Sequence, residues 1–257
     1  MQLEEGPMAT PYVAYNSPRE NCIVDNSGMG RHGRLNTSSC YVSTDTPLGE
    51  YSLHLNGSDT GDKACVIGNL NLDDIKTYTF ASYIKINTWG KQTSGLFNAN
   101  YTSSSSPGDY TASPIHHRDS YFDIAAKGNT VATTGATYQR LSCSTSDIPV
   151  GEWKHVAVTF DGKTATLYID GVKKRSVSFS AAVTLSPCKY IFLSYSSAGG
   201  TQRVTNANWS DFRVYSTCLS ADDIKKLALN HVAVDKGNNL HCYGLVEETG
   251  IEHNISK

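Results

Sequence analysis

The sequence predicts an all-β fold in which two antiparallel sheets pack as a sandwich and one short helix lies near the C-terminus. The composition favours this fold, because the 257 residues include 21 Gly and 15 Tyr while only 18% are charged, as in half-buried strands separated by turns. Several segments alternate apolar and polar residues, which is the period of a strand with one buried face. The length suits one large all-β domain or two small ones.

The first third of the chain predicts a strand, a loop and two further strands. Residues 11–24 are apolar and rich in β-forming side chains, and residues 25–33 place three glycines in a turn-rich loop. Residues 50–57 alternate and end on an Asn-Gly turn. Residues 77–86 repeat the alternation, and we expect a central strand there.

The middle of the chain, residues 98–146, loses this alternation. It is rich in Ser, Thr, Gly and Pro, with short apolar islands at residues 121–124 and 138–141, so we expect long loops between short strands. His116 and His117 are predicted to lie in a solvated loop. Because consecutive residues of an extended segment face opposite ways, the two cannot easily ligate one metal ion.

A meander of antiparallel strands is predicted after the middle region. Residues 153–160 alternate, residues 164–169 form the returning strand, and Asp-Gly turns at 161–162 and 170–171 follow these two strands. Trp153 opens the first of them, and we expect it to be a core anchor rather than a ligand-binding residue.

The last elements are short strands and the helix. Residues 189–195 and 210–215 predict strands on either side of an irregular loop at 196–209. Residues 219–229 predict the helix, because Ser220 is a good N-cap and two aspartates follow at the positive end of the helix dipole.

Charge, hydropathy and cysteine content exclude several classes of protein. A formal net charge of -2 provides no broad basic surface for nucleic acid or an anionic membrane. No run approaches the roughly 20 apolar residues of a membrane-spanning helix. The N-terminal residues lack the basic and apolar regions of a secretory signal, which fits cytoplasmic synthesis or a trimmed chain. Seven cysteines without a C-x-x-C pair favour partly buried free thiols over a disulfide framework.

Five motifs together resemble a known family. They are DNSGMGRHG, GEYSLHLNG, TFASYIK, EWKHVAVTFDGKTATLYIDG and DFRVYSTCLSADDIKKL, at residues 25–33, 49–57, 79–85, 152–171 and 211–227. In this order they are similar to the motifs of laminin-G-like, concanavalin A-like lectin jelly-roll domains. The resemblance covers about residues 11–229, and it implies a two-sheet jelly roll that frequently binds carbohydrate and in many members a Ca²⁺.

The C-terminal segment has a resemblance of its own. Residues 231–257, with the stretch KGNNLHCY, are similar to parts of phage and prophage tail or other virion proteins of Gram-positive bacteria. This similarity implies a location in a virion, with a bacterial secreted or cell-surface protein as the alternative. We divide the chain into an N-terminal tail (1–10), a laminin-G-like β-sandwich (11–230) and a C-terminal hairpin or connector (231–257).

The family resemblance also implies a structural Ca²⁺ site. Asp25, the backbone carbonyls near Gly30 and Gly33, and Asp211 would supply its oxygen ligands. In the alternative interpretation Asp25 only forms an Asx-turn and Asp211 caps the end of a strand. No other cofactor is expected.

Candidate carbohydrate-binding residues lie in the less regular segments. Sugars are bound by stacking on exposed aromatic rings and by hydrogen bonds from polar side chains, and both occur in residues 98–120 and 196–209. The candidates are Trp89, Tyr101, Tyr110, His116, His117, Arg118, Arg203, Asn206, Asn208 and Trp209.

Catalytic motifs are missing from the sequence. It contains no E-x-D-x-E run of the glycosidases of this fold, no G-x-S-x-G, no H-E-x-x-H and no P-loop. We expect a non-enzymatic, lectin-like recognition module of a phage virion that binds host-surface carbohydrate. A virion protein that braces an assembly without binding sugar is the alternative, and a glycoside hydrolase is a remote one. Expected partners are a cell-surface glycan and other virion proteins or further copies of the chain, without nucleic acid or membrane insertion.

Overall fold

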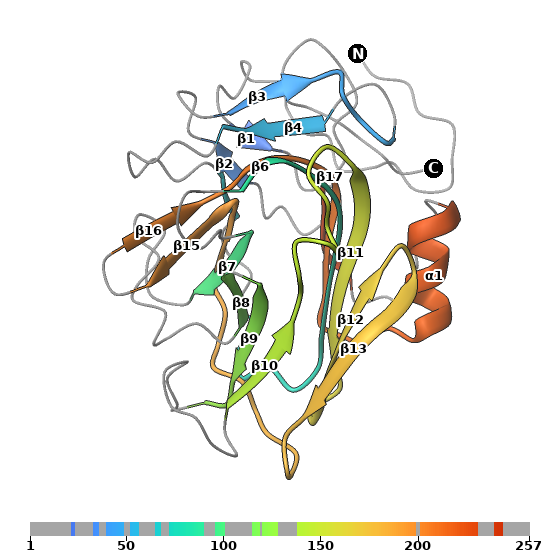
Figure 1. Ribbon diagram of the computed structural model, residues 1–257. Coiled ribbons are helices and arrows are strands. Elements are labelled where there is room, and N and C mark those ends of the chain that lie inside the picture. The colour runs from blue at the N-terminus through green and yellow to red at the C-terminus, as the bar shows by residue number, and fades with distance from the viewer. Residues whose placement is uncertain are drawn as a thin grey trace, which may run out of the picture.

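The computed structural model shows two large antiparallel sheets packed face to face, with a small two-stranded sheet and one helix beside them (Figure 1). It describes residues 22–23, 33–35, 40–48, 52–56, 65–67, 72–89, 96–100, 115–118, 120–127, 138–198, 201–230 and 239–243. The predicted all-β, two-sheet jelly-roll sandwich with one short helix near the C-terminus is confirmed.

The two large sheets each contain eight described strands. Sheet A has the order β1 (Cys22–Ile23), β2 (Gly33–Leu35), β5 (Cys65–Ile67), β14 (Tyr190–Leu193), β7 (Phe97–Asn100), β8 (Ile115–Arg118), β9 (Tyr121–Ala125) and β10 (Tyr138–Ser142). Sheet B has the order β13 (Val172–Ser178), β12 (Thr164–Ile169), β11 (Trp153–Phe160), β6 (Tyr78–Thr88), β17 (Asn206–Tyr215), β4 (Ser52–Leu55) and β3 (Cys40–Ser43), and β18 (Asn239–Tyr243) pairs with β17. The small sheet pairs β15 (Tyr195–Ala198) with β16 (Thr201–Val204).

The hydrophobic core lies between the two sheets. Alternate residues point inward from strands of both sheets, including β4, β6, β11, β12 and β17 of sheet B and β9 and β14 of sheet A, and their apolar side chains form one continuous core. Phe80 packs against Trp209 and Phe212 with ring centroids 6.4 and 5.3 Å apart. Other fully buried members of the core include Leu55, Ile84, Ile86, Phe122, Ile124, Leu141, Val156, Phe160, Leu167, Leu185 and Ile191.

The predicted meander of β11, β12 and β13 is confirmed. The carboxylate of Asp161 accepts hydrogen bonds from the backbone N–H groups of Lys163 and Thr164 at 2.8 and 2.6 Å, which closes the first turn. The second turn has Asp170 and Gly171 at positive φ, 52° and 75°. A side chain on Gly171 would meet the α-carbon of Lys225 at 3.1 Å, so this glycine lets the helix approach the sheet.

The helix α1 (Ala221–Asn230) starts at the predicted cap and covers part of the outer face of sheet B, the face turned away from sheet A (Figure 1). The Ser220 hydroxyl accepts from the Asp223 N–H at 3.2 Å, and the Asp223 carboxylate accepts from the Ser220 N–H at 3.3 Å. Ile224 and Leu227 then pack with buried residues of the sheet. The predicted helix at 219–229 is therefore confirmed, with each end shifted slightly.

Two segments predicted to be irregular contain more strands than expected. Residues 196–209 hold most of the β15–β16 hairpin and the start of β17 rather than a loop. In the region 98–146, β9 and β10 lie at the two apolar islands between the expected long loops, whereas β8 and most of β7 were not expected, so His116 and His117 lie in a strand rather than in a solvated loop. These strands were missed because short, polar strands lack the apolar alternation that marks a strand with one buried face.

The C-terminal strand β18 shares one edge of β17 with β4. Residues 207–209 of β17 pair with β4, while residues 212–215 pair with β18. A register shift between Ser210 and Arg213 separates the two. Part of the segment predicted to be a hairpin or connector therefore belongs to sheet B, and the division at residue 230 stays a prediction.

Three cysteines with described side chains are free thiols. Cys143 and Cys188 are buried and Cys218 is half-buried, as the cysteine pattern predicted for them. Burial raises the pKa of Cys143 to about 12, so this thiol is a poor nucleophile at neutral pH. No helix among the described residues is long and apolar enough to cross a membrane.

Candidate functional site

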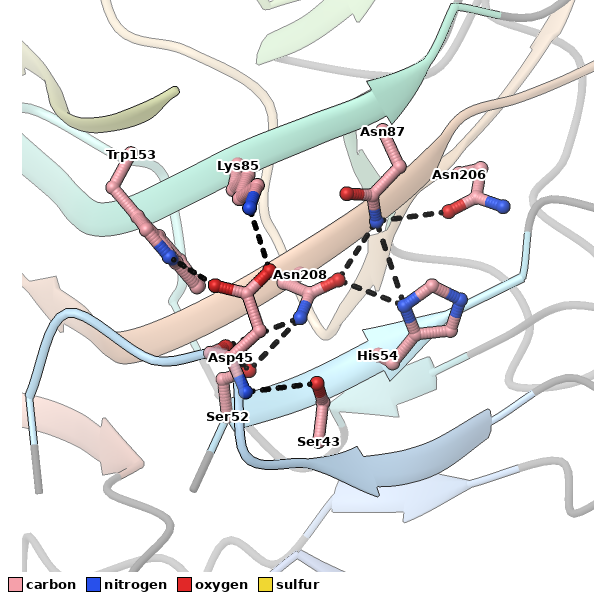
Figure 2. A network of polar contacts seen from close by, with 9 residues as sticks. All are labelled: Ser43, Asp45, Ser52, His54, Lys85, Asn87, Trp153, Asn206 and Asn208. Atoms are coloured by element: carbon pink, nitrogen blue, oxygen red, sulfur yellow. Dashed lines mark hydrogen bonds and ion pairs between the residues drawn. The ribbon is translucent and has the colours of Figure 1, made fainter. Parts of the chain in front are cut away.

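Nine polar or aromatic side chains gather on the outer face of sheet B (Figure 2). The neighbouring part of that face is covered by α1. The nine side chains come from β4, β6, β11, β17 and β3 with the turn after it, and we call them the asparagine cluster. Its members are Ser43, Asp45, Ser52, His54, Lys85, Asn87, Trp153, Asn206 and Asn208.

Strand register explains why residues distant in sequence meet in the asparagine cluster. Trp153 is the cross-strand partner of Lys85, Lys85 is the partner of Asn208, and Asn208 is the partner of His54. Their neighbours in sequence, Ile84, Leu55 and Trp209 among them, point into the core. Because side chains alternate along a strand, the four partners form a row across the outer face of four neighbouring strands.

Asn208 is the centre of the cluster and is only 2% exposed. Its Oδ1 accepts hydrogen bonds from His54 Nδ1 and Asn87 Nδ2, both at 2.7 Å. Its Nδ2 donates to the Asp45 carbonyl at 3.2 Å and to the Ser52 hydroxyl at 3.1 Å. Both lone pairs and both hydrogens of the amide are therefore used.

The amide of Asn87 is oriented by its neighbours. Its Nδ2 donates to Asn208 Oδ1 at 2.7 Å and to Asn206 Oδ1 at 3.0 Å, so a flipped amide would set its own oxygen against two acceptors. The amide oxygen Asn208 Oδ1 carries no hydrogen, so the proton in its contact with His54 belongs to His54 Nδ1, and the 3.5 Å approach of Asn87 Nδ2 to that nitrogen is then not a hydrogen bond.

Asp45 joins the turn after β3 to the cluster. Its carboxylate accepts from Lys85 Nζ at 2.6 Å and from Trp153 Nε1 at 3.0 Å, and its side chain is 44% exposed. The hydrogen bond from Lys85, with that from Trp153, lowers the pKa of Asp45 below its ordinary value near 3.8. Asp45 is therefore ionised at neutral pH and holds the indole of Trp153 against the sheet.

The cluster presents unused polar atoms toward solvent. Asn87 Oδ1 and Asn206 Nδ2 make no hydrogen bond within the part of the chain that the structure describes, and Figure 2 shows Asn206 Nδ2 turned away from the cluster and Asn87 Oδ1 turned to the side on which Lys85 lies. Lys85 uses one of its three N–H donors, on Asp45. Trp153 is half-buried and contributes an aromatic ring at the other end of the row. The arrangement combines an acceptor, donors and a ring on a rigid sheet.

Some of the sequence-predicted binding residues are buried, and for these the prediction was wrong. Trp209 is 2% exposed and its Nε1 donates to the Ser194 hydroxyl at 2.8 Å, so its ring cannot stack on a sugar. His117 is fully buried, with its ring 4.8 Å from that of Phe122 and its Nδ1 accepting from the Leu96 N–H. Asn208 does lie in the cluster, as a buried organiser rather than a surface contact.

The remaining predicted residues are spread over sheet A and the strand ends. Trp89 packs partly against the core and stacks on His117 with ring centroids 6.1 Å apart. His116 and Arg118 belong to β8, and Arg203 to β16, but their side chains lie outside the described part of the structure, as do Tyr101 and Tyr110 as a whole. Among the predicted residues whose side chains are described, the structure brings Trp89 and His117 together, and it places Asn208 and Trp209 on opposite faces of β17.

The predicted calcium ligands are described only in part. Asp211 is 4% exposed, has a φ of 50°, and its Oδ1 accepts from Arg213 Nε at 2.8 Å. Asp25 and Gly30 lie outside the described residues. In the described ranges no group of three or more His, Cys, Asp or Glu side chains could hold a metal ion, and the calcium site stays a prediction.

Sequence analysis missed most of the cluster. Trp153 was predicted to be a core anchor, but the side chain lies on the outer face and bonds to Asp45. His54 and Lys85 were assigned only to the polar face of ordinary strands, and Asn87 lies one residue beyond the strand predicted at 77–86. The signal that could have revealed them is the alternation itself, which places all of them on outer faces; the strand register that joins those faces is not encoded locally.

Comparisons with known proteins agree on the fold. Residues 56–225 match the family model for the concanavalin A-like lectin/glucanases superfamily. No curated protein matches the chain.

Solved structures of bacterial toxin domains share the fold. The binding domain of botulinum neurotoxin serotype G has a TM-score of 0.58 at 13% identity, over 81% of this chain and 48% of that one. The binding domain of Paraclostridial Mosquitocidal Protein 1 gives 0.58 at 13%, over 82% and 52%. That of botulinum neurotoxin DC, in complex with rat synaptotagmin II, gives 0.54 at 16%, over 83% and 52%. The chain thus spans about half the length of these domains.

Proposed function

The chain belongs to the concanavalin A-like lectin/glucanases superfamily, and we propose that it is a non-enzymatic, lectin-like recognition module that binds cell-surface carbohydrate at the asparagine cluster. In this proposal Trp153 supports one face of a sugar ring. Asn87, Asn206 and Lys85 bind its hydroxyl groups.

The observation that carries the proposal is the pair of unused amide atoms, Asn87 Oδ1 and Asn206 Nδ2. A sugar hydroxyl both donates and accepts, so an acceptor and a donor on neighbouring side chains suit it. The two amides are joined by a 3.0 Å hydrogen bond and held by the buried Asn208. They therefore lose little conformational entropy when a ligand binds.

Recognition fits the cluster better than hydrolysis does. A retaining glycosidase needs two carboxyl groups about 5–5.5 Å apart, and an inverting one needs them about 6.5–9.5 Å apart. Among the nine residues of the cluster Asp45 is the one carboxylate. Its lowered pKa is the reverse of what a general acid requires. Hydrolysis is therefore the last of our alternatives.

The solved neighbours support a binding role in general terms. They are binding or receptor-binding domains, and one is in complex with synaptotagmin II. The location in a phage virion, with host-surface glycan as the ligand, rests on the resemblance of residues 231–257. A bracing role in such a particle without sugar binding is the second candidate, since sheet faces can equally pack against other subunits.

The test is a glycan array followed by affinity measurements on the glycans that bind. Trp153→Ala and Asn87→Ala should each weaken binding about tenfold, because one removes the ring and the other the acceptor. Trp153→Phe should retain more affinity than Trp153→Ala, since it keeps an aromatic ring. Thr88→Ala is the matched control, because Thr88 is exposed next to Asn87 but belongs to no part of the cluster.

Two results would contradict the proposal. Glycan binding that is unchanged in both Trp153→Ala and Asn87→Ala would place the site elsewhere. Failure of the wild-type chain to bind any glycan of the array would favour the bracing role.

A further inference from the structure

A second polar group lies on sheet A, at its β9–β10 edge. Tyr121 and Asp123 of β9 and Tyr138 and Arg140 of β10 form it, and we call it the arginine platform. Arg140 is the cross-strand partner of Asp123. The platform shares no residue or strand with the asparagine cluster, because the cluster belongs to sheet B.

Asp123 is the fixed point of the platform. Its side chain is fully buried, and its Oδ1 accepts from the Tyr138 hydroxyl at 2.5 Å and from Arg140 Nε at 2.8 Å. Burial, together with the adjacent Asp123 carboxylate, raises the pKa of Tyr138, so the phenol stays a neutral donor. Charge-assisted bonds of this kind hold the base of the arginine side chain in one place.

The guanidinium of Arg140 is held flat by aromatic rings. Its Cζ lies 4.4 Å from the ring centroid of Tyr121 and 5.7 Å from that of Tyr138. Both distances are within the range of a cation–π interaction. With Nε anchored on Asp123 and one face covered by Tyr121, the group has few alternative orientations.

The guanidinium turns its outer edge away from its partner. Pairing with Asp123 is side-on: Nε donates to Oδ1 at 2.8 Å and Nη2 donates one hydrogen to Oδ2 at 3.5 Å, whereas Nη1 makes no hydrogen bond within the described residues. The side chain is 36% exposed. Side-on pairing leaves free both hydrogens of Nη1 and the second hydrogen of Nη2. Here the two-pronged edge between Nη1 and Nη2 remains for another ligand.

We propose that the arginine platform binds an oxyanion, the carboxylate or phosphate group of an acidic polysaccharide. The edge of a guanidinium matches the two oxygens of such a group, and the pre-set orientation reduces the entropy lost on binding. The inference that the bound anion is part of a glycan rests on the proposed function. The inference that the platform binds an anion does not depend on it.

The experiment titrates the full chain with three probes: oligogalacturonate, short-chain polyphosphate and a neutral gluco-oligosaccharide. The first two separate carboxylate from phosphate as the bound group. Arg140→Lys keeps the charge and the pairing with Asp123 but removes the two-pronged edge, and it should weaken binding of the anionic probe about tenfold. Ser142→Asp is a second variant, on an exposed residue paired with Tyr121, and should weaken binding by repulsion.

The outcomes separate this proposal from the one for the asparagine cluster. The platform is supported when one anionic probe binds, Arg140→Lys and Ser142→Asp weaken it, and Asn87→Ala does not. It is overturned when neither anionic probe binds. It is also overturned when Arg140→Lys binds the anionic probe as tightly as the wild type does, because that result is expected if positive charge alone, and not the guanidinium edge, attracts the probe. Normal thermal unfolding of both variants ensures that lost binding is local. Neutral glycans tested on Asn87→Ala report on the asparagine cluster alone.

Discussion

The outer face of sheet B has two halves that use the same strands differently. In one half α1 packs on apolar and aromatic residues of the sheet. The second, smaller core formed there contains Ala81, Ala157, Tyr168 and Tyr215 of the sheet, Leu219 just before the helix, and Ile224 and Leu227 of the helix. In the other half the same strands β6, β11 and β17 carry the asparagine cluster. The two meet where Tyr83 packs edge-on against His155, with ring centroids 5.0 Å apart.

The difference shows that the side chains on one face of a strand decide whether that face packs against another element or stays accessible to a ligand. Along β6 the outer residues change from Ala81 and Tyr83 to Lys85 and Asn87, while Ile84 and Ile86 on the inner side belong to the core throughout the change. Tyr83, the last outer residue of β6 before Lys85, donates its hydroxyl proton to the Ala228 carbonyl at 2.7 Å and so still contacts the helix. One half of the face is therefore devoted to stability and the other is available for binding.

The largest effect should come from breaking the helix-covered half. Leu227→Ala removes a side chain that is 1% exposed and should lower the free energy of unfolding by about 2–5 kcal/mol. Glycan affinity measured below the unfolding transition should be unchanged. Leu229→Ala is the matched control, since Leu229 is 56% exposed on the same helix and should change stability little. Equal losses in the two variants would mean that α1 does not pack as described.

A smaller loss of stability, but a full loss of binding, is expected from the polar half. Asn208→Ala leaves the buried His54 Nδ1 and one Asn87 N–H without their acceptor, which should cost about 1–3 kcal/mol in chemical denaturation. Glycan binding should disappear because Asn87 loses its orientation. The control is Asn206→Ala, which removes one half-buried bond and should cost less. If Asn208→Ala were as stable as Asn206→Ala, the cluster would not be organised around Asn208.

The smallest effect should be a pH dependence confined to the polar half. The folded pKa of Asp45 lies below its ordinary value near 3.8, so its contribution is complete above that value and is lost as the pH falls through the lowered pKa. For an exposed ion pair the contribution is less than about 1 kcal/mol. Tryptophan fluorescence should change below about pH 3.8 as Trp153 loses its acceptor, by comparison with Asp45→Asn. If the wild type and Asp45→Asn gave identical fluorescence titrations, Asp45 would not be the acceptor of the Trp153 indole, which would contradict its place in the cluster.

Local signals in the sequence were sufficient for the meander and the helix. Asp161 and Gly162 form the predicted turn, with Gly162 at a φ of 98°, and Ser220 caps the helix as predicted. These features depend on hydrogen bonds within a few residues, so the sequence contains the whole interaction. Alternation also marked the positions of β4, β6 and β17, whereas β2, β3, β5, β8 and the β15–β16 hairpin were not predicted.

The candidate site could not be predicted in the same way, and Asn208 and Trp209 show why. Both were assigned to one surface loop, but successive residues of a strand face opposite ways, so one lies in the cluster and the other in the core. The row of Trp153, Lys85 and Asn208 further depends on pairing across long stretches of chain. A single sequence does not state that register.

β4 is synthesised long before β17, the strand whose edge it shares with β18. Leu55 pairs with Ala207, about 150 residues later in the chain, which a ribosome adds in roughly 8–30 s. Until then β4 lacks that neighbour, and Leu53 and Leu55 are without Trp209 and Phe212 in the core they later share. An apolar strand that waits this long is a site for aggregation. A nascent chain that stalls before residue 206 would therefore need a chaperone more than the finished chain does.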